Sequence, residues 1–154
     1  MKRLWKPNHS VTLSLVVTYL AGAALLALMI CMPTLIGLWQ RSLSNYRIVG
    51  MQLMNMQRLF YICCPAGWAA IVSLLLLLHN IRRGEVFTRR NVKLLRLLSW
   101  CFVFVALASV YAVYIYYPCA LIFAAASFLF VILRVVKNVM EQATLMREEQ
   151  ELTI

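Results

Sequence analysis

The chain has 154 residues, of which 64% are hydrophobic and only 13% are charged. A water-soluble domain contains about 45–50% apolar and about 25% charged residues, and a domain of this size keeps much of its surface exposed. These proportions exclude a soluble globular fold and require lipid to cover the apolar surface. The formal net charge of +10 resides mainly at the ends of apolar runs, which favours contact with anionic lipid headgroups over direct nucleic-acid binding.

Two uncharged apolar runs predict the first two membrane spans, at about residues 11–38 and 59–79. The lipid core, roughly 30 Å thick, needs about 20 helical residues. Cations precede the first run as they would in a signal peptide, but the run is about twice as long as the apolar part of such a peptide. We therefore expect a retained anchor, followed by an outer loop at 40–58.

The third uncharged run, Leu97 to Leu133, is too long for a single crossing. As one helix it would extend about 55 Å at 1.5 Å per residue. Proline ends the helix before it and can begin the next, so a break is expected near Tyr116-Tyr117-Pro118. The run therefore predicts two short spans, at about residues 97–116 and 118–134, joined as a hairpin.

The distribution of cations supports four spans with both termini in the cytoplasm. Only Arg41, Arg47 and Arg58 of the 15 Lys and Arg residues then fall on the outer side. Positively charged loops favour the cytoplasmic side. The expected architecture is all-α, a four-span transmembrane helical bundle that forms one membrane domain over residues 1–154.

The sequence contains no pattern typical of a catalytic, cofactor or metal site. Apart from Arg134 at the last position of the fourth span, no charged residue lies in a predicted span, which disfavours an ion path or proton relay. Neither His9 nor His79 forms an evident dyad with a Ser, Cys or carboxylate, and no GxSxG, HExxH or phosphate-binding glycine loop is present. We therefore expect a non-enzymatic protein without a cofactor.

The five cysteines lie in or beside apolar segments and form no CxxC pair. Free cysteine usually behaves as a small buried hydrophobe, and we favour that interpretation. An outer-side disulfide stays open as an alternative; its candidates are Cys31, Cys63, Cys64 and Cys119.

The segment from Ile81 to Arg96 is the most distinctive string, with six cations and one carboxylate between uncharged runs. Gly84 permits a turn after the second span, and Thr88 can cap a helix that runs into the third. Two arginines in the first turn oppose the helix macrodipole, so an anionic partner is expected: lipid phosphate, or alternatively a dedicated protein contact. The candidate interaction residues are Arg82, Arg83, Gly84, Phe87, Thr88, Arg89, Arg90, Asn91, Lys93 and Arg96.

The tail at 135–154 has helical periodicity and is expected to continue the fourth span into the cytoplasm. One face is apolar; its residues are Val135, Val136, Val139, Met140, Ala143 and Met146. Four of the five acidic residues lie in the tail, and Glu148, Glu149 and Glu151 are its interaction candidates. We predict that this tail contacts the basic segment, with Arg89 and Arg90 opposite the glutamates. A solvated tail is the alternative, because exposed ion pairs contribute little.

Two strings resemble a bacterial membrane-protein family known only as domain of unknown function 2975. They are Gly84-Glu85-Val86-Phe87-Thr88 followed by Asn91-Val92-Lys93-Leu94-Leu95-Arg96, and the terminal Glu148-Glu149-Gln150-Glu151-Leu152-Thr153-Ile154. Gln150-Glu151 stands where the family more often has Asn-Asp. The resemblance implies a small four-span protein of the bacterial cytoplasmic membrane, without established enzymatic activity. It also implies a partner, since such proteins often accompany a short helix-turn-helix regulator.

The favoured function is a regulatory or interaction role, in which the protein sequesters or signals to a small cytoplasmic DNA-binding regulator. The alternative is a small pore, transporter or toxin-immunity membrane subunit, and a membrane enzyme that uses the outer cysteines is a third. Pairs of alanines four residues apart in each span permit close helix packing, so a homo-oligomer also stays open. These pairs are Ala23/Ala27, Ala66/Ala70, Ala108/Ala112 and Ala120/Ala124.

Overall fold

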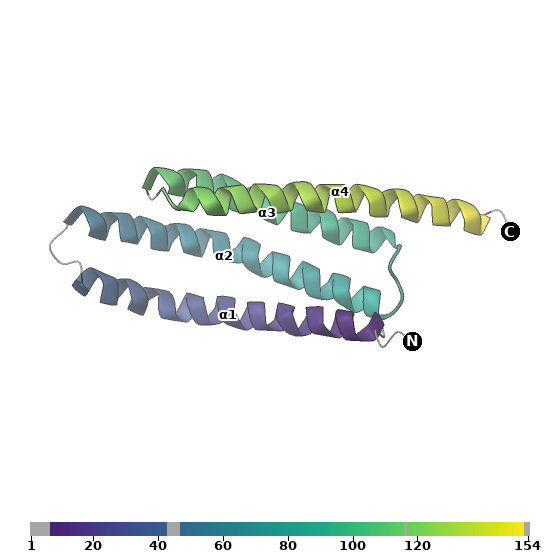
Figure 1. The fold of residues 1–154 in the computed structure, drawn as a ribbon, viewed down its shortest axis with the longest axis horizontal. Helices are drawn as coiled ribbons and strands as arrows, with labels where there is room; N and C mark the ends of the chain where they lie inside the picture. The colour runs from purple at the N-terminus through teal and green to yellow at the C-terminus, as the bar shows by residue number, and fades with distance from the viewer. Residues whose placement is uncertain (1–6, 43–46, 116, 153–154) are drawn as a thin grey trace, which may run out of the picture.

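The computed structural model describes the backbone of residues 7–42, 47–115 and 117–152, and the side chains of 11–38, 53–114 and 117–150. Apart from short turns, the described chain is helical, which confirms the all-α prediction (Figure 1). The helices are α1 (Pro7–Ser42), α2 (Arg47–Arg82), α3 (Arg89–Ile115) and α4 (Cys119–Leu152).

Each helix is long and apolar enough to cross a membrane. The four candidate spans have mean hydropathies between 2.0 and 2.5, and only 11–33% of each apolar window is buried inside the protein. Exposed apolar surface of this extent is stable only against lipid. The chain is therefore a multi-pass membrane protein. Its candidate spans are Val11–Leu38, Leu53–Arg82, Arg89–Tyr114 and Cys119–Gln150.

The predicted break in the third apolar run is confirmed. Helix α3 ends at Ile115 and α4 begins at Cys119, so one antiparallel hairpin replaces one long helix. The backbone N–H of Ala120 donates to the carbonyl of Tyr117 over 2.9 Å. Pro118 has no N–H to donate, which suits it to the start of a helix.

The prediction of a loop at 40–58 is wrong, because helix covers most of this segment. Helix α1 continues to Ser42 and α2 already begins at Arg47, while residues 43–46 lie outside the described part of the chain. The segment 51–58 is rich in Met and Gln, which are unbranched residues with good helix propensity. Its lower hydropathy therefore marks the end of an apolar segment rather than the end of a helix.

The four helices form an open row. Within the described residues, α1 packs against α2, α2 against α3 and α3 against α4, and these are the only helix pairs in close backbone contact. Short antiparallel connections favour packing between chain neighbours. An open row leaves two broad faces for lipid.

A proline in α1 creates a bond to α2. Pro33 lies inside α1, and because it has no N–H, the carbonyl four residues earlier has no donor within the helix. That carbonyl belongs to Met29, and the hydroxyl of Tyr61 in α2 donates to it over 2.9 Å. Lipid provides no hydrogen-bond donor, so this bond satisfies the carbonyl and joins the two helices.

Candidate functional site

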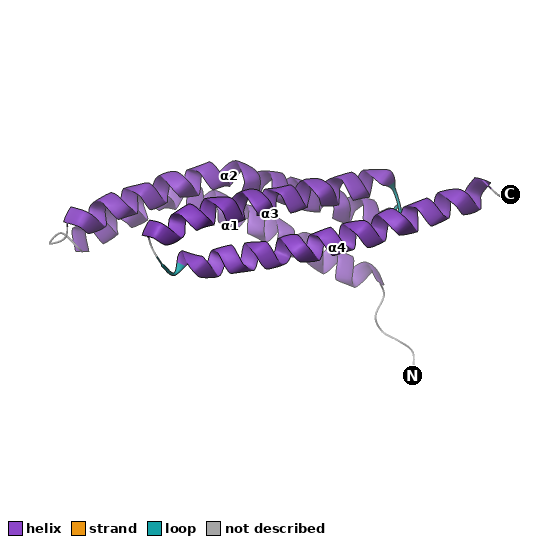
Figure 2. Ribbon diagram, turned by 90° about the horizontal axis from the view of Figure 1, so that it is seen from above, coloured by secondary structure: helices purple, strands orange, loops and turns teal. Residues whose placement is uncertain are grey.

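Most of the polar contacts between helices gather at one end of the row, where α2 ends, α3 begins and α4 finishes. We call this region, residues 79–96 together with 137–150, the basic end. Helix α1 also starts at this end, and α4 runs past the start of α3 in both ribbon views (Figures 1 and 2).

Gly84 ends α2 in a tight, hydrogen-bonded turn. Its φ of +83° lies in the left-handed region, which glycine adopts without steric cost. The N–H of Gly84 donates to the Ile81 carbonyl over 3.0 Å, and the N–H of Glu85 donates to the Asn80 carbonyl over 3.1 Å. This pair of bonds is the Schellman motif that satisfies the last carbonyls of a helix. The predicted turn is confirmed.

Asn91 holds the loop against both helices and is fully buried. Its Nδ2 donates to the carbonyls of Glu85 and Val86 over 2.6 and 2.9 Å. Its Oδ1 accepts from Nδ2 of Asn80 in α2 over 2.7 Å. Asn91 therefore acts as a three-way connector among α2, the loop and α3. Asn80 was not among the interaction residues predicted from the sequence. Its only signal was its position, as an asparagine at the end of an apolar run.

The start of α3 is amphipathic, as predicted. Thr88 Oγ1 accepts from the N–H of Asn91 over 3.4 Å, a long capping bond at the predicted position. Val92 and Leu95 are buried. The cations of this segment are exposed; they are Arg82, Arg83, Arg89, Arg90, Lys93 and Arg96.

The predicted contact between the tail and the basic segment is confirmed at one pair. Arg89 Nε donates to Oε1 of Glu148 over 2.8 Å, and Arg89 Nη2 donates to Oε2 over 2.6 Å. This two-pronged geometry is the strongest form of an arginine–carboxylate contact. Glu149 is also exposed, and the side chain of Glu151 lies outside the described residues.

Solvent weakens the Arg89–Glu148 pair, because the two side chains are 74% and 38% exposed. Glu148 lies roughly 44 Å along α4 from Cys119 at 1.5 Å per residue, beyond the thickness of a lipid core. The hydrogen bond from Arg89 and the positive charge of that side chain lower the pKa of Glu148. The same bond raises the pKa of Arg89.

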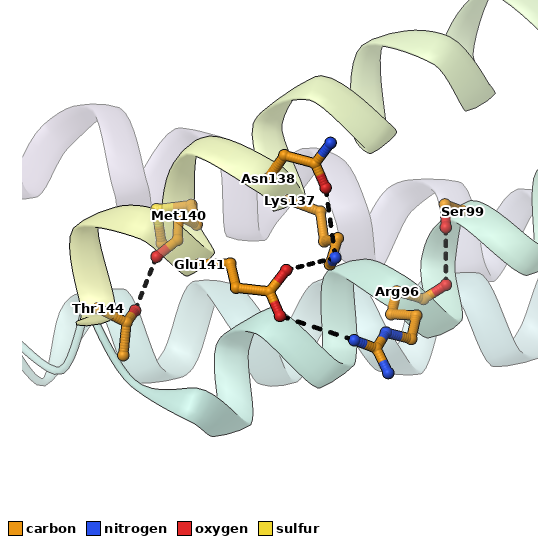
Figure 3. Close-up of polar contacts among 7 residues, drawn as sticks. All are labelled: Arg96, Ser99, Lys137, Asn138, Met140, Glu141 and Thr144. Carbon is orange, nitrogen blue, oxygen red and sulfur yellow. Dashed lines mark hydrogen bonds and ion pairs between the residues drawn. The ribbon is translucent and has the colours of Figure 1, made fainter. Parts of the chain in front are cut away.

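A second ion cluster lies closer to the apolar segments (Figure 3). Glu141 Oε2 lies 2.5 Å from Nζ of Lys137, and Oε1 lies 3.8 Å from Nη2 of Arg96. Lys137 also donates to Oδ1 of Asn138 over 3.3 Å, and its side chain is only 13% exposed. Glu141 thus links α4 to α3. Neither Lys137 nor Glu141 was among the predicted interaction residues, although their spacing of four residues signals a helical ion pair.

The tail of α4 turns its polar face toward the protein. Thr144 is buried and Glu148 is half-buried, and Thr144 donates to the carbonyl of Met140 over 2.7 Å. On the opposite side, Val139 and Met146 are 59% and 58% exposed. The predicted apolar stripe therefore faces away from α3.

Two hollows flank these ion pairs. The basic cavity, of about 220 Å³, is lined by Arg89, Val92, Lys93, Arg96, Glu141, Thr144 and Leu145. The loop cleft is an open hollow of about 450 Å³, lined by Gly84, Glu85, Phe87, Thr88, Arg89, Thr144, Arg147 and Glu148. The loop cleft brings together five of the predicted interaction residues, and the 42% exposed ring of Phe87 lies on its wall.

The described side chains form no group of three or more His, Cys, Asp or Glu that can hold a metal ion. All five cysteines are free. Cys64 and Cys119 are buried, while Cys31 is exposed. The outer-side disulfide that the sequence left open is therefore not formed in this structure.

A comparison with protein families matches residues 8–154 to the family described as "Protein of unknown function (DUF2975)". The matched range covers nearly the whole helix row and all of the basic end. No curated protein and no solved structure matches the chain.

Proposed function

This chain belongs to the DUF2975 family of proteins of unknown function, and from that premise we propose that it is a non-enzymatic membrane protein with a regulatory role. In this proposal its basic end binds a small cytoplasmic DNA-binding regulator and holds it at the bacterial cytoplasmic membrane. The proposal rests on one observation, the loop cleft, which is a largely polar hollow at the end of otherwise apolar helices.

The charge distribution supports a cytoplasmic position for the basic end. The residues at this end include Arg82, Arg83, Arg89, Arg90, Lys93, Arg96, Lys137 and Arg147. Loops rich in Lys and Arg are retained on the cytoplasmic side. The chain has four candidate spans, and an even number of crossings returns it to the side on which it began. The start of α1 and the end of α4 therefore lie on the same side as the basic end.

The composition of the loop cleft suits a protein partner. Binding energy at protein interfaces concentrates in a few aromatic and arginine side chains that fill pockets. Phe87 and Arg147 on the cleft wall are residues of this kind, and Glu85 adds a carboxylate. The Schellman turn and Asn91 hold the cleft in one shape, which lowers the entropy cost of binding.

The polar groups at the basic end support a binding role over catalysis. Glu141 and Glu148 are engaged with cations, and the Thr144 hydroxyl donates to its own helix. Catalysis by a nucleophile needs a base within hydrogen-bond reach. These groups instead give the cleft fixed charges and a fixed shape.

The test is purification from the native host in a mild detergent. We expect a small DNA-binding protein to co-purify with the wild-type chain and to be lost with Phe87→Ala. Met146→Ala is the matched control, because Met146 is also an exposed apolar side chain but does not line the cleft. Retention of the DNA-binding protein by Phe87→Ala, or its equal loss in both variants, would contradict the proposal.

The alternative function, a pore or transporter subunit, requires a lumen through which the solute passes. A single open row encloses no lumen between its described helices, so a pore needs several copies. Ion flux into liposomes that contain only this protein would favour that alternative over the regulatory role.

A further inference from the structure

We propose that the basic cavity is a binding site for a phosphate group, supplied by the headgroup of an anionic membrane lipid. The proposal is independent of the protein partner and of the loop cleft. It depends on three features of α3 and α4: an excess of positive charge around the cavity, one cation without a partner among the described residues, and an apolar track that continues from the cavity along α3.

The cavity is positively charged even after its ion pairs are counted. Arg89, Lys93 and Arg96 line it together with a single carboxylate, Glu141. Glu148 engages Arg89 from outside the cavity lining. Glu141 is shared between Arg96 and the adjacent Lys137. Two carboxylates therefore face four cations, and the excess positive charge is complementary in sign to a phosphate group.

Lys93 is the open cation of this cluster. It lies four residues after Arg89 and three before Arg96, so the three side chains share one face of α3. Its ammonium has no ion-pair or hydrogen-bond partner among the described residues. The Thr144 hydroxyl, which also lines the cavity, donates to the Met140 carbonyl. An ammonium at the edge of a cavity and without an acceptor is suited to bind an anion.

The size of the cavity favours a small anionic group. Clefts that hold drug-sized ligands measure about 300–1,000 Å³, and the basic cavity measures about 220 Å³. A phosphate with part of its glycerol fits this space better than a nucleotide does.

The surface below the cavity favours a lipid as the source of the phosphate. Trp100, Phe104 and Leu107 are exposed, and their spacing places them on the same face of α3 as Lys93. Tryptophan is typical of the headgroup level in membrane helices. A lipid with its phosphate in the cavity would lay its acyl chains along these side chains, whereas free phosphate would gain nothing from them.

The rival explanation is diffuse attraction between a basic surface and an acidic membrane. In that case every exposed cation of the segment contributes alike. Arg90 distinguishes the two explanations, because it is exposed on α3 but does not line the cavity. If the cavity is a specific site, Lys93 contributes more to lipid binding than Arg90 does. If the attraction is diffuse, the two cations contribute alike.

The test measures lipid binding by the full chain in a neutral detergent, by native mass spectrometry. The probes are dioleoyl phosphatidylglycerol, the zwitterionic phosphatidylcholine with the same acyl chains, and soluble glycerol phosphate. We expect Lys93→Gln to weaken phosphatidylglycerol binding about fivefold, the equivalent of one cation near an acidic surface. We expect Lys93→Arg to retain binding, and Arg90→Gln to change affinity by less than about twofold.

The remaining outcomes decide against the proposal or against its lipid source. Equal losses in Lys93→Gln and Arg90→Gln, or no loss in either variant, would overturn the site. Binding of phosphatidylcholine as tight as that of phosphatidylglycerol would also overturn it, because the site would then not select net negative charge. Lys93-dependent binding of glycerol phosphate as tight as that of phosphatidylglycerol would support the phosphate site and overturn the lipid source.

Discussion

Arg89 and Glu148 stand 59 positions apart in the sequence and meet through two hydrogen bonds, of 2.8 and 2.6 Å. The pair fixes the end of α4 against the first turn of α3 and forms part of the wall of the loop cleft. It also compensates for an arginine at the positive end of a helix macrodipole. One ion pair thus sets both the position of the tail and the shape of the candidate site.

Reversing the charge of Arg89 should release the tail. Arg89→Glu places two carboxylates together and replaces attraction with repulsion. We expect a severalfold faster cleavage within residues 142–152 during limited proteolysis in detergent, and recovery when Glu148→Arg is added. Arg90→Glu is the control, since Arg90 does not line the cleft. Unchanged cleavage in Arg89→Glu would show that the pair does not hold the tail.

The tail should also respond to acid. The pKa of Glu148 is lowered in the folded protein, first by the hydrogen bond from Arg89. A lowered folded pKa means that the contact is fully present above the ordinary value of 4.5 and is lost as the pH falls below that value. We expect amide hydrogen exchange in the tail, corrected for the intrinsic rate, to increase in that acidic range. In Glu148→Gln this increase in hydrogen exchange should disappear. An increase of the same size in the variant would mean that the titration of another group causes it.

Asn91 should be the most sensitive polar side chain at the basic end. Asn91→Ala removes the partner of Asn80 and the donor to two loop carbonyls. A buried polar group left without a partner costs about 1–3 kcal/mol. We expect thermal unfolding in detergent to show a loss of stability of that size. Asn138→Ala is the control at an exposed asparagine, and an equal loss in both variants would deny Asn91 a special role.

A substitution at Gly84 should strain the turn. Its φ is +83° and the space around its Cα is open, so Gly84→Ala isolates backbone strain from steric overlap. The left-handed conformation costs about 1–2 kcal/mol for a residue with a Cβ. Gly37→Ala is the matched control, because Gly37 also has open space and lies inside α1 without a positive φ. At position 37 alanine should leave the stability unchanged or increase it. A similar loss of stability at both positions would contradict the strain argument.

The spans and the turn chemistry were predictable because they depend on local sequence. Hydropathy located the four apolar helices, Pro118 marked the hairpin, and Gly84 and Thr88 marked the loop between α2 and α3. The bond between Asn80 and Asn91 and the packing of Glu141 against Arg96 depend on which helix faces lie together. Periodicity gave the tail an apolar and a polar face, and charge indicated that its glutamates meet the basic segment, but neither indicated that Thr144 is buried against the protein.

The bond from Tyr61 to the Met29 carbonyl should depend on Pro33. Tyr61→Phe removes the hydroxyl that donates to a carbonyl whose usual helical donor is replaced by the proline, and we expect a loss of about 1 kcal/mol of stability in thermal unfolding. Pro33→Ala restores an N–H within reach of that carbonyl. In the Pro33→Ala background, Tyr61→Phe should therefore cost less, and the double-mutant cycle should show a coupling energy.

The control for this cycle is Tyr111→Phe, because the Tyr111 hydroxyl has no hydrogen bond among the described residues. Its substitution should cost the same with and without Pro33. Zero coupling between positions 33 and 61 would mean that the Met29 carbonyl finds another donor, such as water at the end of the helix. Significant coupling would instead identify Tyr61 as the residue that allows a proline inside α1, and would explain why the first two helices remain joined in a row that does not close.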